Sequence, residues 1–316
     1  IRYRKAVWQS DLIMNKVIVI AGPTASGKTG LGIEVAKAIG GEIISADSMQ
    51  VYKNMPIATA APTDEEKSQA PHHLVEFLDN DEKFSVAEWC TLAKEKINDI
   101  FSRGKVPVIV GGTGLFIDSL VDNISFEDIE VDEDLRQKLM SRDIDSLYDE
   151  LLKVDKKAAE NIHKNNKKRV VRALELHYLG SSKTVQNENS RKEKSPYDFL
   201  YFVLQYENRQ TLYDRINLRV DRMLESGLLD EASAMQGKYQ KTSAQAIGHK
   251  ELARYLNGEA SLEECIQKLK QESRRYAKRQ ITWFKRRNDA VFIPMDKLKD
   301  SAAKTVIDKC EDFLNG

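Results

Sequence analysis

The amino-acid sequence predicts an α/β protein, a P-loop-type doubly wound parallel sheet with a helical insertion domain. A glycine-rich loop, "GPTASGKT" (22–29), stands between an apolar strand and a helix. Further strands alternate with helices along the chain, which is typical of a parallel sheet. Between 123 and 196 this alternation stops, and charged helical segments take its place. We therefore predict a core made of 14–122 and 197–316, with an insertion domain at 123–196.

The first part of the core contains three predicted buried strands. "KVIVIA" (16–21) is a continuous apolar run, and the helix after the loop stops at Gly40-Gly41. "EIISAD" (42–47) and "KVPVIVGG" (105–112) are the next strands, and between them a helix at 85–104 starts with a capping serine. Ligands of such sheets collect at the carboxyl ends of the strands, so we expect the loop, Asp47 and the end of the third strand to converge.

The remaining segments are predicted in the same way. "SSKTVQNENSRKEKSP" (181–196), at the end of the insertion, is polar and is expected to be an exposed linker. "DFLYFVLQYE" (198–207) returns to strand character, and helices follow over 209–227 and 261–287. A last strand at 290–296 precedes a final helix. Residues 1–13 are interpreted as a frayed leader, since Met14 stands just before the first strand.

The composition excludes several classes of protein. With 41% hydrophobic and 31% charged residues, the chain is ordinary for a globular protein, and no apolar run approaches the ~20 residues of a membrane span. Cys90, Cys265 and Cys310 lack the paired spacing of a disulfide framework or a zinc site. We expect a cytoplasmic protein with no membrane association. The net charge is zero, but basic blocks at 163–172 and 273–287 can still form a positive face.

The glycine-rich loop predicts a phosphate-binding site. Its backbone N–H groups and the following helix N-terminus hold phosphate oxygens, Lys28 adds a positive charge, and Thr29 offers its hydroxyl to Mg²⁺. A nucleoside triphosphatase would also need a metal-holding Asp at the end of a buried strand. The strand at 105–112 supplies none, so Asp47 is the well-placed carboxylate. Asp47 can hold a metal, accept a proton or cap the next turn, and spacing alone does not decide between these roles.

Three further features each allow two interpretations. Arg215, Arg219 and Arg222 share one helical face, which is either solvated or clamps a second phosphate. The segment 273–287 mixes Lys and Arg with aromatic residues, which suits RNA but also suits an amphipathic helix with its aromatic rings in the core. The pair His72-His73 has no other His or Cys near it, so we predict a packed turn there instead of a metal site.

Together these residues closely resemble one family, tRNA dimethylallyltransferase, also called tRNA isopentenyltransferase. The resemblance covers nearly the whole chain after Met14, in the order of the family. "DSMQVY" after the second strand, "GGTG" and "KRQITWF" are far more specific than the loop alone. The matching stretches are "GPTASGKT" (22–29), "ISADSMQVYKNMPIATAAPT" (44–63), "APHHLVEF" (70–77), "VPVIVGGTGLFI" (106–117), "RVVRALEL" (169–176), "AIGHKEL" (246–252) and "YAKRQITWFKRR" (276–287).

The resemblance implies an enzyme that transfers the dimethylallyl group of dimethylallyl diphosphate to tRNA and releases pyrophosphate. The acceptor is the exocyclic N6 amine of the adenosine 3′-adjacent to the anticodon, and its base must be flipped out of the stack. In this family the loop holds the diphosphate and no ATP is hydrolysed, which accounts for the missing metal-holding Asp. The implied cofactor is Mg²⁺, the implied partner is the tRNA anticodon stem-loop, gripped by the insertion, and we expect a monomer.

Carried over position by position, the resemblance makes Asp47 the general base for the weakly nucleophilic amine. Lys28, Thr29 with Mg²⁺, and Arg219 stabilise charge on the departing pyrophosphate. The implied diphosphate-binding residues are Gly22, Pro23, Thr24, Ala25, Ser26, Gly27, Lys28, Thr29, Arg215 and Arg219. The implied tRNA-binding residues are Asp47, Ser48, Met49, Gln50, Thr113, Arg136, Lys168, Arg169, Val170, Val171, Arg172, Ala246, Ile247, Gly248, His249, Lys250, Glu251, Lys278, Arg279, Gln280, Ile281, Thr282, Trp283, Phe284 and Lys285.

This sequence departs from the family pattern at two positions. His249 stands where the family usually has Tyr, and Phe116 replaces a frequent Tyr. Both keep an aromatic ring, so we expect stacking to survive and a hydrogen bond to change. The sequence also has no zinc-finger extension of the kind that many eukaryotic members carry, so we expect a bacterial-type enzyme.

Two other functions compete with transfer to tRNA. One is a P-loop small-molecule kinase or an adenylate isopentenyltransferase, which prenylates free adenine nucleotides. The other is a tRNA-binding protein with an inactive loop. The basic insertion and the basic, aromatic C-terminal helix favour tRNA over a free nucleotide, and intact Lys28, Thr29 and Asp47 favour an enzyme.

Overall fold

A computed structural model describes residues 15–126, 132–189, 193–238 and 243–316. The chain divides into two compact units, one made of Ile1–Val121 with Pro196–Gly316 and the other of Asp122–Ser195. We call them the sheet unit and the helical unit. The leader expected at 1–13 lies outside the described residues. No helix in the described part of the chain is both long and apolar enough to cross a membrane.

The sheet unit contains a six-stranded sheet whose neighbouring strands are all parallel, as the sequence predicts. Across the sheet the order is β3 (His72–His73), β2 (Gly41–Ala46), β4 (Val106–Gly111), β1 (Lys16–Ala21), β5 (Asp198–Gln205) and β6 (Val291–Pro294). The packed turn predicted at His72-His73 is corrected, because these residues pair with Ile43 and Ile44 and so form the edge strand β3.

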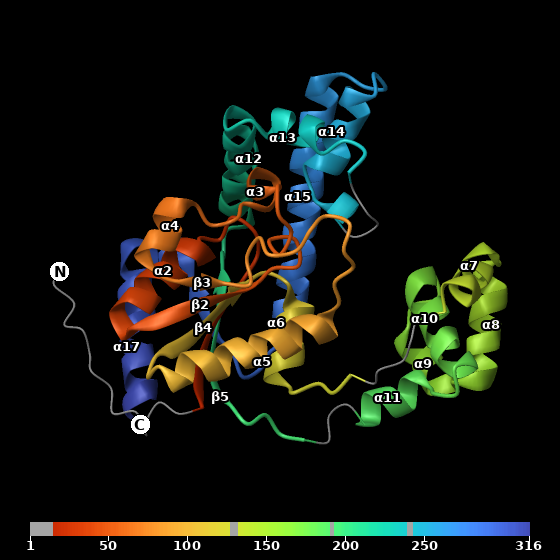
Figure 1. Ribbon diagram of the computed structural model, residues 1–316, viewed down its shortest axis with the longest axis horizontal. Helices are drawn as coiled ribbons and strands as arrows, with labels where there is room; N and C mark the ends of the chain where they lie inside the picture. The colour runs from red at the N-terminus through yellow and green to blue at the C-terminus, as the bar shows by residue number, and fades with distance from the viewer. Residues whose placement is uncertain (1–14, 127–131, 190–192, 239–242) are drawn as a thin grey trace. The chain divides into compact units, whose positions relative to one another are not determined.

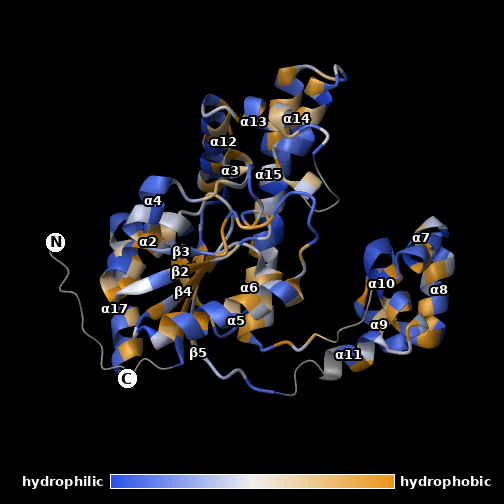
Figure 2. Ribbon diagram, in the orientation of Figure 1, coloured by the Kyte–Doolittle hydropathy of each residue, from blue (hydrophilic) through white to orange (hydrophobic). Residues whose placement is uncertain are grey.

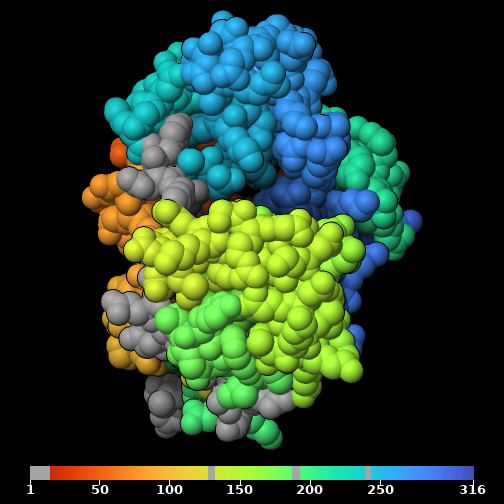
Figure 3. Space-filling view, turned by 90° about the vertical axis from the view of Figure 1, so that its right-hand side faces the viewer, coloured from red at the N-terminus to blue at the C-terminus, as the bar shows by residue number. Residues whose placement is uncertain are grey.

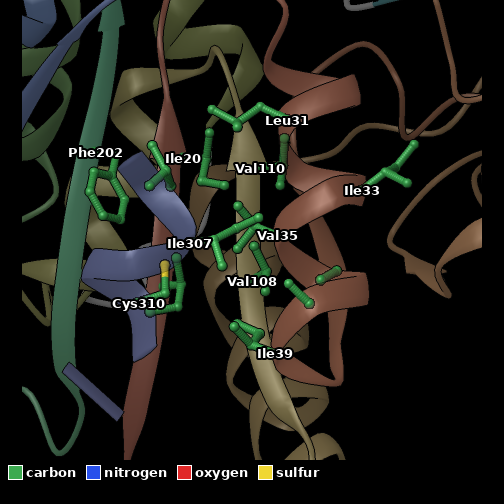
Figure 4. Close-up of a cluster of buried hydrophobic side chains, with 14 of the residues drawn as sticks. Ile20, Leu31, Ile33, Val35, Ile39, Val108, Val110, Phe202, Ile307 and Cys310 are labelled. Carbon is green, nitrogen blue, oxygen red and sulfur yellow. The ribbon is translucent and has the colours of Figure 1, made fainter. Parts of the chain in front are cut away.

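Helices cover both faces of this sheet (Figure 1). On one face α2 (Lys28–Ile39) and α17 (Ala302–Asn315) share a core with alternate residues of the strands, in which Ile307 of α17 joins Ile20 of β1 and Val110 of β4 (Figure 4). On the other face lie α5 (Val86–Ser102) and α6 (Gly114–Val121), and the Tyr201 hydroxyl of β5 donates a hydrogen bond to Asp118 of α6. Successive strand residues point to opposite faces, so strands covered on both sides are apolar throughout. In Figure 2 the strands are mostly coloured as apolar, while the helices over them carry both polar and apolar residues.

The predicted helix starts follow from local capping. Ser85 accepts a hydrogen bond from the Glu88 backbone N–H, while the Glu88 carboxylate accepts one from the Ser85 N–H, and α5 begins there. Ser261 and Glu264 form the same capping box at the start of α15 (Leu262–Phe284). Such reciprocal bonds satisfy two of the four N–H groups that a helix start leaves unpaired.

Further helices gather beyond the carboxyl ends of the strands (Figure 1). They are α3 (Pro56–Thr59), α4 (Asp64–Gln69), α12 (Arg209–Glu225), α13 (Leu228–Ala234), α14 (His249–Leu256) and α15. Val220, Leu228, Leu252 and Leu269 join four of them in a separate apolar core. The short η1 (Ser243–Gln245) precedes α14, and α16 (Met295–Leu298) and η2 (Lys299–Ser301) connect β6 to α17. These helices place polar side chains opposite the phosphate loop.

The helical unit has its own core. It contains α7 (Glu133–Ser141), α8 (Ile144–Val154), α9 (Lys156–Asn161), α10 (Lys167–Tyr178) and α11 (Lys183–Asn189). Leu139, Leu147, Leu151 and Leu174 are buried together, and the helices form one packed block (yellow to green, Figure 3). Each of α7 to α10 starts with an Asp or Asn cap, which sets the boundaries between short helices.

The expectation of an exposed linker at 181–196 is partly wrong, because the helix α11 occupies Lys183–Asn189. Thr184 donates hydrogen bonds from its backbone N–H and its hydroxyl to the Asp155 carboxylate, at 3.0 and 2.5 Å. Asp155 is itself the N-cap of α9 and is buried. This tertiary anchor holds a polar segment in a helical turn that its composition alone does not favour.

Candidate active site

A cavity of about 1040 Å³ lies in the sheet unit, beyond the carboxyl ends of the strands. Its walls come from the phosphate loop and α2, the segment after β2, α3, α4, α12, α14 and α15. The predicted convergence of the loop with the end of β2 is therefore present. Lys28, Thr29, Asp47, Arg219 and Tyr276 all line this one cavity.

The phosphate loop takes its shape from glycine. Gly22 has φ 156°, and a Cβ there would lie 2.9 Å from the Leu204 carbonyl oxygen, so a larger residue would collide with β5. Gly27 has φ 92° in the left-handed region and is the N-cap of α2. The loop thus turns sharply between β1 and α2, which leaves the backbone N–H groups at the start of α2 available to an anion.

Lys28 is held at the cavity wall with its charge poorly solvated. Its Nζ donates a hydrogen bond to the Pro23 carbonyl oxygen at 2.7 Å. Burial and, to a smaller extent, the positive charge of Arg219 lower the Lys28 pKa, the Asp47 carboxylate opposes both effects, and the resulting pKa is about 7. An anionic ligand would strongly stabilise an ammonium group in this position, because the negative charge replaces the solvation that burial removes.

Arg219 and Arg215 differ in position although both belong to α12. Arg219 lines the cavity, and burial lowers its pKa while the charge of Asp47 opposes that shift. Arg215 does not line the cavity: its Nε donates to the Ala25 carbonyl oxygen at 3.0 Å, and its guanidinium lies 5.7 Å from the Tyr206 ring centroid. Arg219 is therefore the arginine that can meet a ligand beside Lys28, while Arg215 supports the loop backbone.

Asp47 both caps a turn and faces the cavity. Its Oδ1 accepts a hydrogen bond from the Met49 backbone N–H at 2.9 Å, which is the turn-capping role that the sequence left open. The carboxylate also acts electrostatically on Lys28, Arg219 and Tyr276 across the cavity. Because Oδ1 is engaged in the turn, the carboxylate is held in one orientation, and it remains able to accept a proton from a ligand.

Two side chains from the predicted tRNA-binding segments hold the site together. Thr113 Oγ1 accepts from the Ser48 backbone N–H at 2.9 Å, so it joins the segments that follow β4 and β2. The buried Gln280 amide accepts from the Thr24 N–H at 2.8 Å and donates to the Gly112 carbonyl oxygen at 2.9 Å. Gln280 therefore fixes the phosphate loop against the end of β4.

A metal ion at this site would depend mainly on ligands that a phosphate brings. Thr29 lines the cavity and offers one hydroxyl. Within the described residues no group of three or more His, Cys, Asp or Glu side chains could hold a metal. This donor set fits Mg²⁺, which keeps several waters and binds through one or two protein groups plus substrate phosphates.

The other predicted diphosphate residues lie in or beside the loop. Thr24 lines the cavity, whereas Ala25 faces Arg215. Pro23 supplies the carbonyl oxygen that holds Lys28. Ser26 is 1% exposed, and its hydroxyl has no hydrogen-bond partner among the described groups.

The predicted tRNA-binding residues are divided between surface and interior. Exposed members lie in both units and are Lys168, Arg169, Lys250, Lys278, Arg279, Thr282 and Lys285. Partly exposed members are Asp47, Ser48, Met49, Gln50, Thr113, Arg136, Arg172, Ile247, Ile281 and Trp283. Buried members are Val170, Val171, Ala246, Gly248, His249, Glu251, Gln280 and Phe284. Of this last group Ala246, Glu251 and Gln280 line the cavity, and the others lie in the interior.

Several of these side chains already have protein partners. Arg136 and Arg172 both bind the buried Glu175 carboxylate, Arg136 through two nitrogens. The Trp283 indole N–H donates to Asp118 at 2.6 Å. The amphipathic-helix interpretation thus describes the aromatic residues of α15 near its end, while Arg275, Lys278 and Arg279 face solvent.

The two rings that replace family tyrosines are both inside the protein. Phe116 is 5% exposed and stacks on Trp89 with centroids 4.9 Å apart. His249 is 2% exposed, and its Nε2 lies 2.7 Å from Glu231, whose carboxylate also accepts from the Ile57 N–H of α3. Neither ring lines the cavity. The expected stacking is therefore internal at Phe116, and His249 instead ties α14 to α13 and α3.

Sequence reasoning left Tyr276 out of the site. One face of α15 lines the cavity through Leu269, Glu272, Ser273, Tyr276, Arg279 and Gln280. These positions recur at intervals of three and four, so a helical projection of 261–287 could have placed Tyr276 beside Gln280. On α12, Arg222 also lines the cavity together with Arg219.

Comparison with known proteins gives consistent matches. A family model described as IPP transferase matches residues 50–287, and one described as isopentenyl transferase matches 15–82. The chain is 46% identical to a tRNA dimethylallyltransferase of Acetivibrio thermocellus over 301 residues, which cover 93% of this chain and 96% of the relative. It is 46% identical to that of Halalkalibacterium halodurans over 287 residues, 89% of this chain and 91% of the relative.

Two solved structures extend this similarity to the fold. The full-length tRNA isopentenylpyrophosphate transferase of Bacillus halodurans has a TM-score of 0.72 and 42% identity, covering 95% of this chain and 97% of that one. A eukaryotic dimethylallyltransferase, solved in crystallographic snapshots of its action on tRNA, has a TM-score of 0.82 and 32% identity, covering 95% of this chain and 80% of that one.

Proposed function

Because the chain belongs to the tRNA dimethylallyltransferase family, we propose that it transfers a dimethylallyl group from dimethylallyl diphosphate to tRNA and releases pyrophosphate. The acceptor is the N6 amine of the adenosine 3′-adjacent to the anticodon. The single observation that carries this proposal is the cavity in which two poorly solvated cations, Lys28 and Arg219, face one carboxylate, Asp47. The cations suit a departing diphosphate, and the carboxylate suits an amine that must lose a proton.

The residues act at opposite ends of one displacement. As the bond from the amine nitrogen to C1 of the dimethylallyl group forms, the bond from C1 to the diphosphate oxygen breaks and its electrons leave with pyrophosphate. Lys28, Arg219 and the loop N–H groups stabilise that negative charge. Asp47 accepts the proton that the amine loses, which prevents positive charge from accumulating on nitrogen. The atoms and charges therefore balance without a covalent enzyme intermediate.

Thr29 would help to hold a divalent metal, which we propose to be Mg²⁺, when the diphosphate is bound. When bound, the metal neutralises part of the charge that develops on the leaving group. The cavity volume, at the upper end of the range for small-molecule sites, accommodates a diphosphate ester together with an extruded base. Both substrates can therefore be present at once, as a direct displacement requires.

Recognition of tRNA depends on the exposed cations. Lys168 and Arg169 lie on α10 of the helical unit, and Lys278 and Lys285 lie on or just after α15. Lysine and arginine side chains on a surface bind RNA phosphates and make affinity fall as salt rises. This substrate is the basis for expecting a cytoplasmic enzyme, and we expect it to act as a monomer, which light scattering of the purified protein tests.

The direct test is incubation of purified protein with unmodified tRNA, Mg²⁺ and labelled dimethylallyl diphosphate. We expect label in the tRNA on N6 of one adenosine and stoichiometric pyrophosphate release. A parallel reaction with ATP alone tests the kinase alternative, and we expect no phosphate release in it. Labelled free AMP with no labelled tRNA would contradict the proposal and favour an adenylate isopentenyltransferase.

A further inference from the structure

The cavity contains one large aromatic side chain. Of the described residues that line it, Tyr276 is the only Phe, Tyr or Trp. The other aromatic residues of the same helix segment are committed elsewhere, since Phe284 is 1% exposed and the Trp283 indole donates to Asp118. Phe116 and His249 are also buried away from the cavity lining. Any stacking of a ligand on a large aromatic ring at this site therefore falls to Tyr276.

Tyr276 interacts with residues at both ends of the proposed reaction. Its side chain interacts electrostatically with both Asp47 and Arg219. The hydroxyl is hydrogen-bonded to the Thr113 and Gln280 side chains, and these are the residues that join the loop, the β2 end and the β4 end. The ring is thus anchored to the rigid part of the site at its polar end.

The remainder of the ring is accessible. Tyr276 is partly exposed, and the Arg279 guanidinium carbon lies 5.5 Å from its centroid. Arg279 is exposed and forms no ion pair with the described residues, so it can move from the ring when a base arrives. An electron-rich ring that attracts a guanidinium also offers the flat surface on which a purine stacks.

We propose that Tyr276 is the stacking residue for the acceptor base, so that adenine extruded from the RNA packs on its ring with N6 directed towards Asp47. This inference rests on the proposed function. An extruded purine loses its stacking on the neighbouring bases of the RNA loop. An aromatic side chain can replace that stacking, because every base has a flat face that packs on an aromatic ring. The anchored hydroxyl gives the ring one fixed plane, which sets the plane of the base relative to C1 of the donor.

A binding experiment tests this proposal without chemistry. The probe is an anticodon stem-loop RNA with 2-aminopurine at the acceptor position, which lacks the 6-amine and fluoresces when unstacked. We expect low emission from the complex with the native protein. Tyr276→Leu should raise the emission severalfold and weaken RNA binding by about 5- to 140-fold, the range for losing one stacked base. Tyr276→Phe should keep the emission low, because it keeps the ring.

A matched control is Tyr255→Leu. Tyr255 is exposed on α14 and does not line the cavity, so the same substitution there should leave emission and affinity unchanged. Should Tyr276→Leu fail to fold, Tyr276→His keeps a smaller polar ring and should give an intermediate rise in emission.

The proposal is overturned if folded Tyr276→Leu binds the probe with native emission and affinity. It is also overturned if that variant only lowers the thermal midpoint and weakens diphosphate binding, since a purely structural role predicts that result. Failure of the proposed function would show separately, as native protein that transfers no label to unmodified tRNA. An active native enzyme with an indifferent Tyr276→Leu variant would reject this inference alone.

Discussion

The lowered pKa of Lys28 predicts that diphosphate affinity depends on pH. Burial and the charge of Arg219 bring this pKa from an ordinary 10.5 to about 7 in the unliganded protein. Below pH 7 the side chain is protonated and can bind the diphosphate at once. Above pH 7 the free enzyme loses this proton, and it must take one up again when the diphosphate binds, because the anion restores the ordinary preference for the ammonium form.

The size of the effect follows from this pKa. If the bound diphosphate keeps Lys28 protonated up to pH 9, the affinity falls with the fraction of protonated free enzyme. That fraction drops about 50-fold between pH 7 and pH 9 for a group of pKa about 7. At pH 8 the binding of one diphosphate should take up about 0.9 proton. Dimethylallyl diphosphate is already fully ionised there and contributes little to the count.

Titration calorimetry measures both quantities. Dissociation constants are determined from pH 6 to 9 with Mg²⁺ at saturation, and proton uptake is obtained at pH 8 from buffers of different ionisation enthalpy. Lys28→Arg is the matched control, since a guanidinium keeps its charge throughout this range and should show no proton uptake. A dissociation constant that stays flat from pH 7 to 9 in the native protein, with no proton uptake at pH 8, would refute the reasoning.

Further predictions concern the base, the clamp and the RNA surface. Asp47→Asn should reduce transfer at least 100-fold while RNA binding persists, because the amide still caps the turn but accepts no proton; single-turnover assays and filter binding check this. Gln280→Leu should lower the free energy of unfolding by roughly 2–4 kcal/mol in denaturant titrations, because Thr24 N–H and the Gly112 carbonyl lose a buried partner; a change below 0.5 kcal/mol, within the usual range for surface substitutions, would contradict it. Lys168→Gln with Arg169→Gln should flatten the salt dependence of RNA affinity by about one to two units of slope, and an unchanged slope would exclude this face of α10 from RNA binding.

The fold was predictable because each element carries a local signal. The strand at 16–21 is a continuous apolar run, as expected for a strand that is covered on both faces. Ser85 and Ser261 mark the starts of two helices because they form capping boxes. The segments that were predicted wrongly lack such signals. β3 is two histidines that pair only because β2 offers an open edge, and α11 is a polar helix held through Asp155. Both depend on partners far away in the sequence.

The site was predictable as a set of motifs but not as a set of roles. The family pattern places Gln280 and Arg279 one residue apart, yet one fixes the phosphate loop from the interior and the other is exposed at the cavity. A pattern of residue types cannot separate these roles, because adjacent positions on a helix point about 100° apart. Arg215 and Arg219 show the complementary problem, since they share a helical face but lie at different depths, and only Arg219 reaches the cavity.

The electrostatic balance of the cavity also bears on why a phosphate loop would serve a transfer reaction. Burial disfavours the charged forms of Lys28 and Arg219 in the unliganded protein. A bound anion therefore stabilises both positive charges. Diphosphate gains charge as the bond to carbon breaks, and the two cations therefore bind the transition state more strongly than the ester. The Met49 N–H holds the Asp47 carboxylate in place. In this position Asp47 could accept a proton from either a water molecule or an amine. Whether the amine or water reacts then depends on what occupies the space between Asp47 and Arg219. A flat base packed on Tyr276 would fill that space and exclude water, so the ring that positions the acceptor would also protect the donor from hydrolysis.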